Sequence, residues 1–90
     1  MKLDNLRSIL VYPMTVRQLA VVLAIHETSH KFKLRELAVF LRASRPSITR
    51  SYDALCRFGL LRRERCDKDH RDVYGLLTDK GKKLAKEISL

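Results

Sequence analysis

The sequence predicts a mainly α-helical fold with one small β-hairpin, in the order helix, helix, helix, hairpin, helix. Three observations predict it. Apolar residues recur at helical spacing up to Gly59, two strand-like segments follow between residues 60 and 77, and helical spacing returns after Thr78. The chain has 90 residues, no internal repeat and no Gly/Ser linker, so we expect one domain over residues 1–90.

The first part of the chain predicts a helical extension followed by a capped helix. Residues 1–14 form the expected extension, with apolar residues at helical spacing until Pro13 ends it. Thr15 and Gln18 then form a capping-box pattern, in which each side chain bonds the other residue's backbone N–H. Residues 28–29, a Thr and a Ser, should end this helix. The residues expected on its inward stripe are Val16, Leu19, Ala20 and Leu23.

Residues 34–58 predict two short helices joined by a tight turn. The first spans Leu34–Leu41 and the second Arg45–Phe58. Ser44 can cap the second helix, and Gly59 should end it. The residues expected to face inward are Leu37, Ala38 and Leu41 in the first helix and Ile48, Tyr52 and Leu55 in the second.

Residues 60–77 predict a hairpin wing. Its strands are expected at Leu60–Arg65 and Val73–Leu77, joined by the polar loop 67–72. Thr78 should then cap the last helix. The inward residues of that helix are expected to be Leu84, Ala85 and Ile88.

Charge is the unusual property of the composition. Nineteen Lys and Arg residues face ten Asp and Glu residues, which gives a net charge of +9. A field of this sign attracts polyanions such as nucleic acid. The longest apolar run, Leu19–Ile25, is about a third of what a membrane-spanning helix needs. Two cysteines, Cys56 and Cys66, fit a reducing interior better than a disulfide scaffold, so we expect a cytoplasmic protein.

The paired helices predict a DNA-binding helix-turn-helix, whose second helix enters the major groove. The side chains expected to recognise bases are Arg45, Ser47, Thr49 and Arg50. Arg45 and Arg50 carry a planar donor fork that binds guanine or phosphate, whereas the short Ser and Thr side chains let the helix approach closely. The residues expected to contact the DNA backbone are Ser44, Arg57 and Arg63.

The hairpin predicts a second contact with DNA. Lys68, His70 and Arg71 are expected at its tip, where an Arg side chain can enter the minor groove. The alternative is that this loop is an ordinary solvated turn. Its position directly after a helix-turn-helix favours the winged arrangement.

These segments resemble the MarR-type (multiple antibiotic resistance) regulators over about residues 15–85. The resemblance is carried by Leu37-Ala38, by the run SRPSITR at 44–50, by Leu55, by the run GLLRR at 59–63, and by Asp69-His70-Arg71 with Leu77-Thr78-Asp79-Lys80-Gly81 after it. It implies a winged helix-turn-helix that binds specific DNA sequences, often as a repressor relieved by a small molecule or by oxidation. It places Ser47, Thr49 and Arg50 in the recognition helix and Arg71 at the wing, with Asp69 orienting a neighbouring Arg.

Two departures from that family matter. His70 stands where an Arg is usual. We also expect the chain to lack the long C-terminal helices that dimerise the family, so that its usual dimer and effector pocket are in question. A homodimer could instead form through residues 3–11 or through outward-facing Tyr74 and Leu76, unless these residues pack within the small core. The expected partner is double-stranded DNA, without a cofactor or membrane, and the sequence identifies no small-molecule effector.

Other signals leave alternatives open. His26, Glu27 and His30 spell the H-E-x-x-H pattern of zinc proteases, in which a helix presents both histidines to one metal. A helix end at residues 28–29 would prevent that geometry, and no third ligand has a clear place, so we expect no metal site and no enzyme. Cys56 and Cys66 could act as a redox switch, although buried, unreactive thiols are the simpler interpretation. A winged-helix module that binds proteins rather than DNA is the main alternative function, which the charged recognition helix disfavours.

Overall fold

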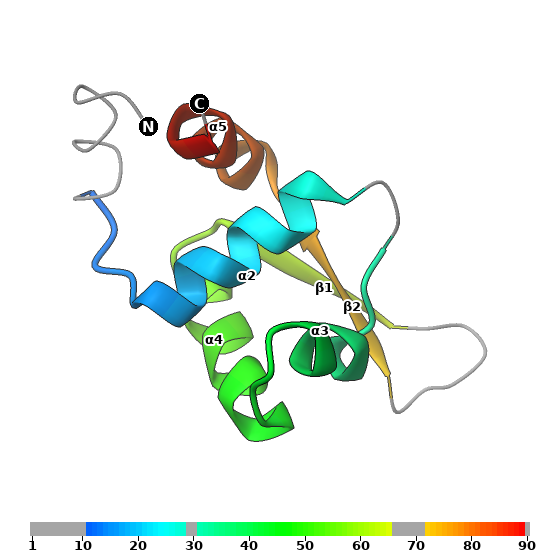
Figure 1. Ribbon diagram of the computed structural model, residues 1–90. Helices are drawn as coiled ribbons and strands as arrows, with labels where there is room; N and C mark the ends of the chain where they lie inside the picture. Colours follow the sequence, from blue (N-terminus) through cyan, green and yellow to red (C-terminus); the bar gives the residue numbers. More distant parts are fainter. Residues whose placement is uncertain (1–10, 29–30, 66–71, 90) are drawn as a thin grey trace.

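The computed structural model describes residues 11–28, 31–65 and 72–89. Its elements are α2 (Val16–Glu27), α3 (Leu34–Phe40), α4 (Arg45–Arg57), β1 (Leu61–Arg65), β2 (Val73–Leu77) and α5 (Asp79–Ser89). The mainly α fold with one hairpin is therefore confirmed (Figure 1). The expected helix within residues 1–14 lies largely outside the described residues.

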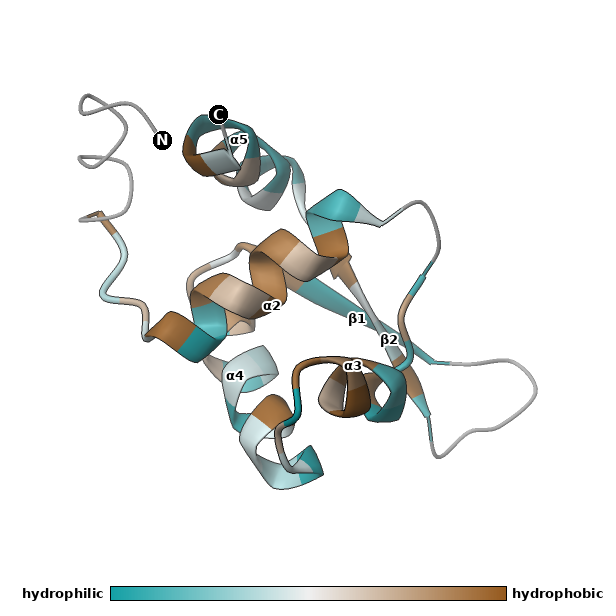
Figure 2. Cartoon of the chain, viewed as in Figure 1, coloured by the Kyte–Doolittle hydropathy of each residue, from teal (hydrophilic) through white to brown (hydrophobic). Residues whose placement is uncertain are grey.

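Helix α2 occupies the middle of the molecule and contacts α4, α5 and β2. Figure 1 shows α5 on one side of α2 and the pair α3 and α4 on the other, with the hairpin along one edge. Hydrophobic colouring runs along most of α2 in Figure 2, as expected for a helix surrounded by other elements. The largest fully buried side chains are Val21, Val22, Leu37, Ile48, Tyr52, Leu55 and Leu60.

The boundaries of α2 were predicted, but its buried face was not. Thr15 and Gln18 form both bonds of the capping box, and the helix ends before Thr28, whose backbone is extended. The expected inward stripe began at Val16, which is 85% exposed, whereas Val21 and Val22 are fully buried. The prediction was right for Leu19 and Leu23, which are partly buried against the core. It was wrong at Val16, because the middle of α2 is apolar almost all round. Its neighbours, rather than its period, determine which face is covered.

Helix α4 follows the sequence prediction closely. Ser44 caps it, because its hydroxyl accepts a hydrogen bond from the Ser47 N–H at 3.2 Å. Gly59 follows the helix with φ +76°, a left-handed conformation that favours glycine. The predicted inward residues Ile48, Tyr52 and Leu55 are fully buried. Of the polar residues between them, Thr49 and Arg50 are exposed. Ser51 is buried, and its hydroxyl donates to the Ser47 carbonyl at 3.0 Å.

The hairpin is antiparallel, with Arg62 opposite Leu76 and Arg63 opposite Gly75. Successive strand residues point to opposite faces, so Arg63 and Gly75 face α4 while Arg62 and Leu76 face outward. The other edge of β2 carries a bridge between Tyr74 and Lys33. Helices α2 and α4 therefore cover one face of the hairpin, and Arg62 is exposed on the other face.

Helix α5 is fixed to the end of α4 by a compact set of contacts. The Thr78 hydroxyl donates to the Gly59 carbonyl at 2.7 Å and accepts from the Gly81 N–H at 3.1 Å. A Cβ on Gly81 would lie 2.1 Å from the Leu60 carbonyl oxygen, so only glycine allows this approach. We refer to Gly59, Leu60, Thr78 and Gly81 as the α5 junction. It explains structurally why a Leu-Thr-x-x-Gly pattern follows the hairpin.

Within the described ranges, no helix is both long enough and apolar enough to cross a membrane.

Candidate nucleic-acid interface

The first two turns of α4, with their cap, form the reading segment, which we define as residues 44–50. Arg45, Thr49 and Arg50 are exposed, while Ser47 is partly buried. Arg50 Nη2 donates to Ser47 Oγ at 3.4 Å, and Ser44 Oγ donates to the same oxygen at 2.8 Å. The structure therefore brings together the four predicted base-recognising residues on one exposed stretch of helix. It also indicates that Ser47 orients Arg50.

The start of α4 offers few backbone donors to an anion. Pro46 has no N–H, and the N–H of Ser47 already bonds Ser44. Arg45 is therefore the residue among the first three helical positions whose N–H can be offered to a phosphate. Most of the affinity of this segment for an anion must come from side chains and from the helix dipole.

The three residues predicted to contact the DNA backbone lie in different environments. Ser44 is the exposed N-cap of α4, and Arg57 is exposed in its last turn. Arg63 forms an ion pair with Asp53 of α4, and its guanidinium lies 6.0 Å from the centre of the Tyr52 ring. Arg63 thus links β1 to α4.

A second ion pair joins the helix-turn-helix to the hairpin. Arg35 Nε of α3 lies 3.3 Å from Asp72 Oδ2, and Asp72 is only 8% exposed. Sequence reasoning had assigned Asp72 to the polar loop and gave Arg35 no role. Neither ion pair can be recognised from the sequence alone, because the partners belong to different elements and have no fixed spacing in the chain. Together they flank a cleft of about 500 Å³ between α3, α4 and the hairpin, which Arg45 and Thr49 also line.

Tyr52 sets the separation between α4 and β2. It is fully buried, and a Cβ on Gly75 would lie 2.6 Å from its hydroxyl oxygen. Desolvation by burial raises the pKa of Tyr52 to about 12, although the nearby Arg63 guanidinium acts in the opposite direction. The hydroxyl has no hydrogen-bond partner in the part of the chain that the structure describes. The hairpin can therefore approach α4 closely because residue 75 has no side chain.

The predicted wing residues Lys68, His70 and Arg71 lie outside the described residues, as does Cys66. Their contacts remain predictions. The described ends of the two strands, Arg65 and Val73, pair with each other directly beside this segment.

The helix needed for the H-E-x-x-H geometry does not continue far enough. Helix α2 ends at Glu27, and Thr28 is extended with φ −103° and ψ 147°. His26 is in the last turn, whereas His30 lies outside the described residues. Among the residues described, no three His, Cys, Asp or Glu side chains are grouped so that they could hold a metal ion. Cys56 is a partly buried free thiol on α4.

Known proteins that resemble this chain in sequence or structure are transcriptional regulators or share its fold. The family model "Transcriptional regulator SarA/Rot" matches residues 7–88. No curated protein sequence matches the chain. The structure is similar to YusO from Bacillus subtilis, with TM-score 0.81 and 26% identity over 94% of this chain and 60% of that one.

Two further structures show the same fold at lower identity. AbsC, a MarR family transcriptional regulator from Streptomyces coelicolor, has TM-score 0.80 and 17% identity over 96% of this chain and 59% of its own. FabT from Streptococcus pneumoniae, solved in complex with DNA, has TM-score 0.75 and 22% identity over 82% of this chain and 51% of its own. The expected MarR-type resemblance is therefore confirmed. This chain spans about half to three fifths of the length of these three proteins.

Proposed function

This chain belongs to the SarA/Rot family of transcriptional regulators, and we propose that it binds specific sequences of double-stranded DNA, as a repressor and without enzymatic chemistry. The observation that carries the proposal is the reading segment. A capped helix of a helix-turn-helix exposes Arg45, Thr49 and Arg50 at its start. This is the part of a recognition helix that meets base edges in the major groove.

The side chains of the reading segment take different roles in this proposal. Arg50, steadied by Ser47, recognises a guanine through its two donor nitrogens. Arg45 stands beside the cleft and binds either a base or a phosphate. Thr49 is small enough for close approach and contacts a base or a thymine methyl group. Ser44 and Arg57 lie toward the two ends of α4 and contact the DNA backbone.

The wing supplies the second contact in this proposal. Lys68, His70 and Arg71 reach the neighbouring minor groove, where negative potential attracts basic side chains. The ion pairs Asp53–Arg63 and Arg35–Asp72 support this role, because both join the hairpin to the helices of the helix-turn-helix. In this arrangement Arg63 acts mainly by holding β1 against α4, and its remaining exposed surface is available to a phosphate.

A twofold dimer is part of the proposal, since paired half-sites increase specificity. Its half-sites should be about 34 Å apart, one turn of DNA. FabT, which has the same fold, was solved with DNA and is about twice as long as the matched region. In this chain, residues 3–11 or the outward residues Tyr74 and Leu76 would form the contact. Analytical ultracentrifugation with and without operator DNA would determine whether a dimer forms.

The first experiment is fluorescence-anisotropy binding of promoter fragments from the host, near physiological salt and with excess random duplex. Retention of a few fragments would support a sequence-specific regulator and identify its operator. Binding should weaken steeply as salt rises, because phosphate contacts release counterions. Uniform weak binding that salt abolishes would contradict the proposal.

A variant of the reading segment sharpens this test. Arg50→Ala should weaken binding to the preferred fragment by roughly 1–3 kcal/mol and bring it closer to random DNA, which is the effect of losing one good base contact. Lys83→Ala removes the same charge from exposed α5 and should leave the discrimination unchanged. Lys68→Ala should weaken all sequences about equally if Lys68 contacts phosphate alone. Unchanged discrimination in Arg50→Ala would refute the assignment of this residue.

One observation favours the alternative of a protein-binding module. Val39 is 79% exposed and Phe40 is 62% exposed, both on α3 of the helix-turn-helix. Neighbouring exposed apolar side chains can mark a protein contact. If the chain shows no preference among DNA sequences, Val39→Ser and Phe40→Ser variants would identify this surface in binding assays against candidate partners.

A further inference from the structure

A groove of about 450 Å³ lies between α3 and the start of α4. Its lining residues are Arg35, Glu36, Ala38, Val39, Ala43 and Arg45. Arg45 belongs to the reading segment, whereas the others belong to α3 and to the turn that follows it. The groove therefore adjoins the surface proposed for DNA but is formed mostly by another helix.

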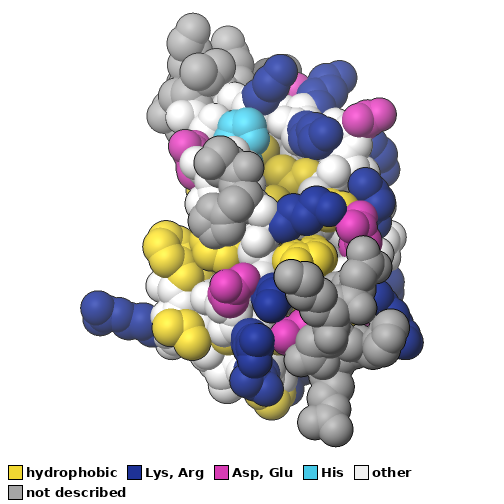
Figure 3. All heavy atoms as spheres, turned by 90° about the vertical axis from the view of Figure 1, so that its right-hand side faces the viewer, with side chains coloured by type: hydrophobic (Ala, Val, Ile, Leu, Met, Phe, Trp, Pro, Cys, Tyr) yellow, Lys and Arg dark blue, Asp and Glu magenta, His cyan; other side chains and the backbone are white. Residues whose placement is uncertain are grey.

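The apolar part of this surface is well exposed. Val39, which lines the groove, is 79% exposed, and the adjacent Phe40 is 62% exposed, with its ring 5.6 Å from that of the buried Phe32. Figure 2 shows hydrophobic colour over the second half of α3. Figure 3, viewed from the right of Figure 1, shows exposed hydrophobic side chains with Lys and Arg side chains beside them. Neighbouring exposed apolar side chains are typical of a protein contact.

The charge of the groove is positive at its α4 end. The Glu36 carboxylate accepts a hydrogen bond from the Lys33 N–H at 2.9 Å, so it is occupied in capping the start of α3. Arg35 Nε lies 3.3 Å from Asp72, whereas Arg45 has no ion pair within the described residues. A carboxylate from a partner would therefore be attracted more strongly to Arg45 than to Arg35.

Three kinds of partner can be compared with this surface. In the major groove of DNA the thymine methyl is the main apolar group, so DNA would cover little of Val39 and Phe40. A second copy of the chain carries the same net charge of +9 and is repelled. An acidic segment of another protein fits both features, because it supplies carboxylates for Arg45 and apolar side chains for Val39.

We propose that this groove docks an acidic segment of another protein that carries at least one apolar side chain. The apolar side chain lies in the groove against Val39, and a carboxylate of the segment binds Arg45. Since Arg45 cannot bind this carboxylate and DNA together, the partner displaces DNA. The displacement rests on the proposed DNA binding, whereas the docking itself does not.

The first test uses three short synthetic peptides on the full chain without DNA. One contains Asp, Glu and Leu, the second has Ser in place of each Leu, and the third has Asn and Gln in place of Asp and Glu. The first peptide should shift the NMR amide signals of Ala38, Val39 and Ala43, because its Leu side chains cover these residues. The second and third peptides should bind much more weakly, since each lacks one of the two features.

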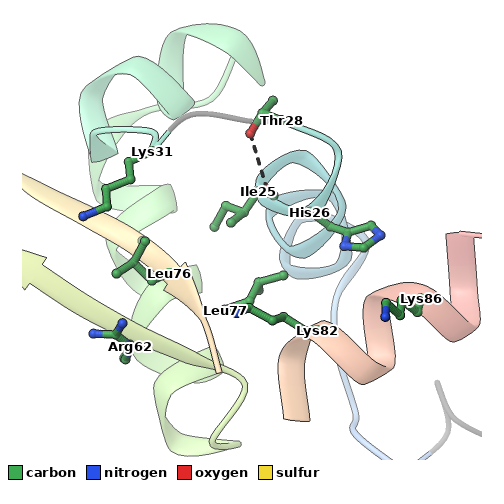
Figure 4. Close-up of a pocket in the computed structure, with 10 residues that line it drawn as sticks. Ile25, His26, Thr28, Lys31, Arg62, Leu76, Leu77, Lys82 and Lys86 are labelled. Atoms are coloured by element: carbon green, nitrogen blue, oxygen red, sulfur yellow. Dashed lines mark hydrogen bonds between the residues drawn. The ribbon is translucent and has the colours of Figure 1, made fainter. Parts of the chain in front are cut away.

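A second basic pocket provides a control for the general charge of the protein. It lies between α2, the hairpin and α5, and its lining includes Arg62, Leu76, Leu77 and Lys82 (Figure 4). It shares no residue with the groove beside Val39. Shifts confined to this pocket would overturn the proposal, because they would place the peptide elsewhere.

Two valine variants test the surface itself. Val39→Ser should weaken binding of the first peptide roughly tenfold, because it removes the apolar contact in the groove. Val16→Ser makes the same change at a valine that is 85% exposed on α2 and outside the groove, and it should leave the peptide affinity unchanged. Both variants should keep their affinity for DNA, since neither residue belongs to the reading segment. The amide spectrum of each variant checks that it is folded.

The second test adds the preferred DNA fragment. In anisotropy titrations the first peptide should release this fragment from the unchanged protein, and roughly tenfold more peptide should be needed with Val39→Ser. If no DNA fragment binds at all, the proposed function fails, while Leu-dependent binding of the peptide at Val39 still supports the docking site.

Four results would overturn the proposal in addition to shifts elsewhere. They are no binding of the first peptide at millimolar concentration, equal binding of the Ser-containing peptide, binding of the first peptide without release of DNA, and equal release of DNA from Val39→Ser. The last result would mean that the total charge of the protein, rather than this groove, attracts the peptide. Loss of DNA affinity in Val39→Ser would also contradict it, because Val39 would then belong to the DNA surface.

Discussion

The reading segment and the α5 junction carry much of the resemblance to the MarR-type regulators, and their side chains point in opposite directions. In the reading segment, Arg45, Thr49 and Arg50 extend away from the protein. In the α5 junction, Thr78 and Gly81 are directed at the protein itself, where they meet the backbone of the α4–β1 turn. Two patterns that belong to the same family resemblance therefore have different structural causes. One marks an outward-facing surface, and the other marks a packing constraint.

Binding and stability measurements can separate the outward-facing role from the packing role. A change at the exposed Arg45, Thr49 or Arg50 should alter DNA binding without altering the free energy of unfolding. A change in the α5 junction should lower that free energy, and should affect DNA binding only through loss of the folded state. Gly81→Ala tests the α5 junction, Tyr52→Phe tests the buried contact between α4 and β2, and substitutions of Ser44 test the start of the reading segment.

The largest effect is expected for Gly81→Ala. Alanine normally stabilises a helix by about 1 kcal/mol relative to glycine. Here the added Cβ would lie 2.1 Å from the Leu60 carbonyl oxygen, which belongs to the backbone and cannot rotate away. Forcing the two elements apart should lower the free energy of unfolding by about 3 kcal/mol or more. Urea denaturation followed by circular dichroism measures this change.

Lys83→Ala is the matched control for Gly81→Ala, since it introduces the same residue at an exposed position of the same helix. It should leave the urea midpoint almost unchanged. If Gly81→Ala were as stable as the unchanged protein, the close approach of α5 to Leu60 would be wrong.

The second effect concerns Tyr52 and strongly alkaline pH. Burial raises the pKa of Tyr52 from 10.0 to about 12, so the folded state retains the phenolic proton after the unfolded chain has lost it. The folded state thus binds more protons between pH 10 and pH 12, and stability falls as pH rises through this interval. The contribution is fully present below pH 10. The loss attributable to this group should be on the order of 2 kcal/mol.

Tyr52→Phe isolates this contribution, because other Tyr and Lys residues titrate over the same interval. The variant should lose less stability than the unchanged protein between pH 10 and pH 12. At pH 7 it should be at least as stable, since the hydroxyl that it removes has no hydrogen-bond partner in the described structure. Parallel stability curves for the two proteins would show that Tyr52 is not buried as described.

Much of the fold could be predicted because its boundaries are set by local chemistry. The capping box of Thr15 and Gln18, the Ser44 cap and the left-handed Gly59 each act within a few residues. Such signals are visible in a linear sequence. The complete buried face of α2 could not be predicted in this way. A helix that is apolar on nearly every side has no hydrophobic periodicity that indicates which side is buried.

The contacts between distant segments could not be predicted for a different reason. Arg35–Asp72 and Asp53–Arg63 bring together residues that have many possible partners in a chain with nineteen basic residues. The same holds for the pocket that faces Lys82, which requires three elements to be placed in space before it exists. Sequence reasoning predicted an exposed, basic start of α4, but it could not determine which basic residues were already paired within the protein.

The smallest effect is expected at Ser44, where the two roles meet in one residue. Ser44→Ala removes the acceptor of the Ser47 N–H and should lower the free energy of unfolding by about 1 kcal/mol. Ser44→Asp keeps an acceptor there, and its negative charge suits the positive end of the helix, so stability should be retained.

For DNA binding, Ser44→Asp should have the larger effect and Ser44→Ala the smaller, which is the reverse of their effects on stability. If Ser44 faces a phosphate, the Asp carboxylate repels it, and Ser44→Asp should weaken binding to all sequences while Ser44→Ala changes affinity little. Anisotropy titrations at one salt concentration, paired with urea midpoints, measure both properties. If Ser44→Asp binds DNA as tightly as the unchanged protein, Ser44 acts only as a helix cap. The DNA-contacting part of the reading segment would then begin at Arg45, and the division between outward and inward roles would fall between two adjacent residues.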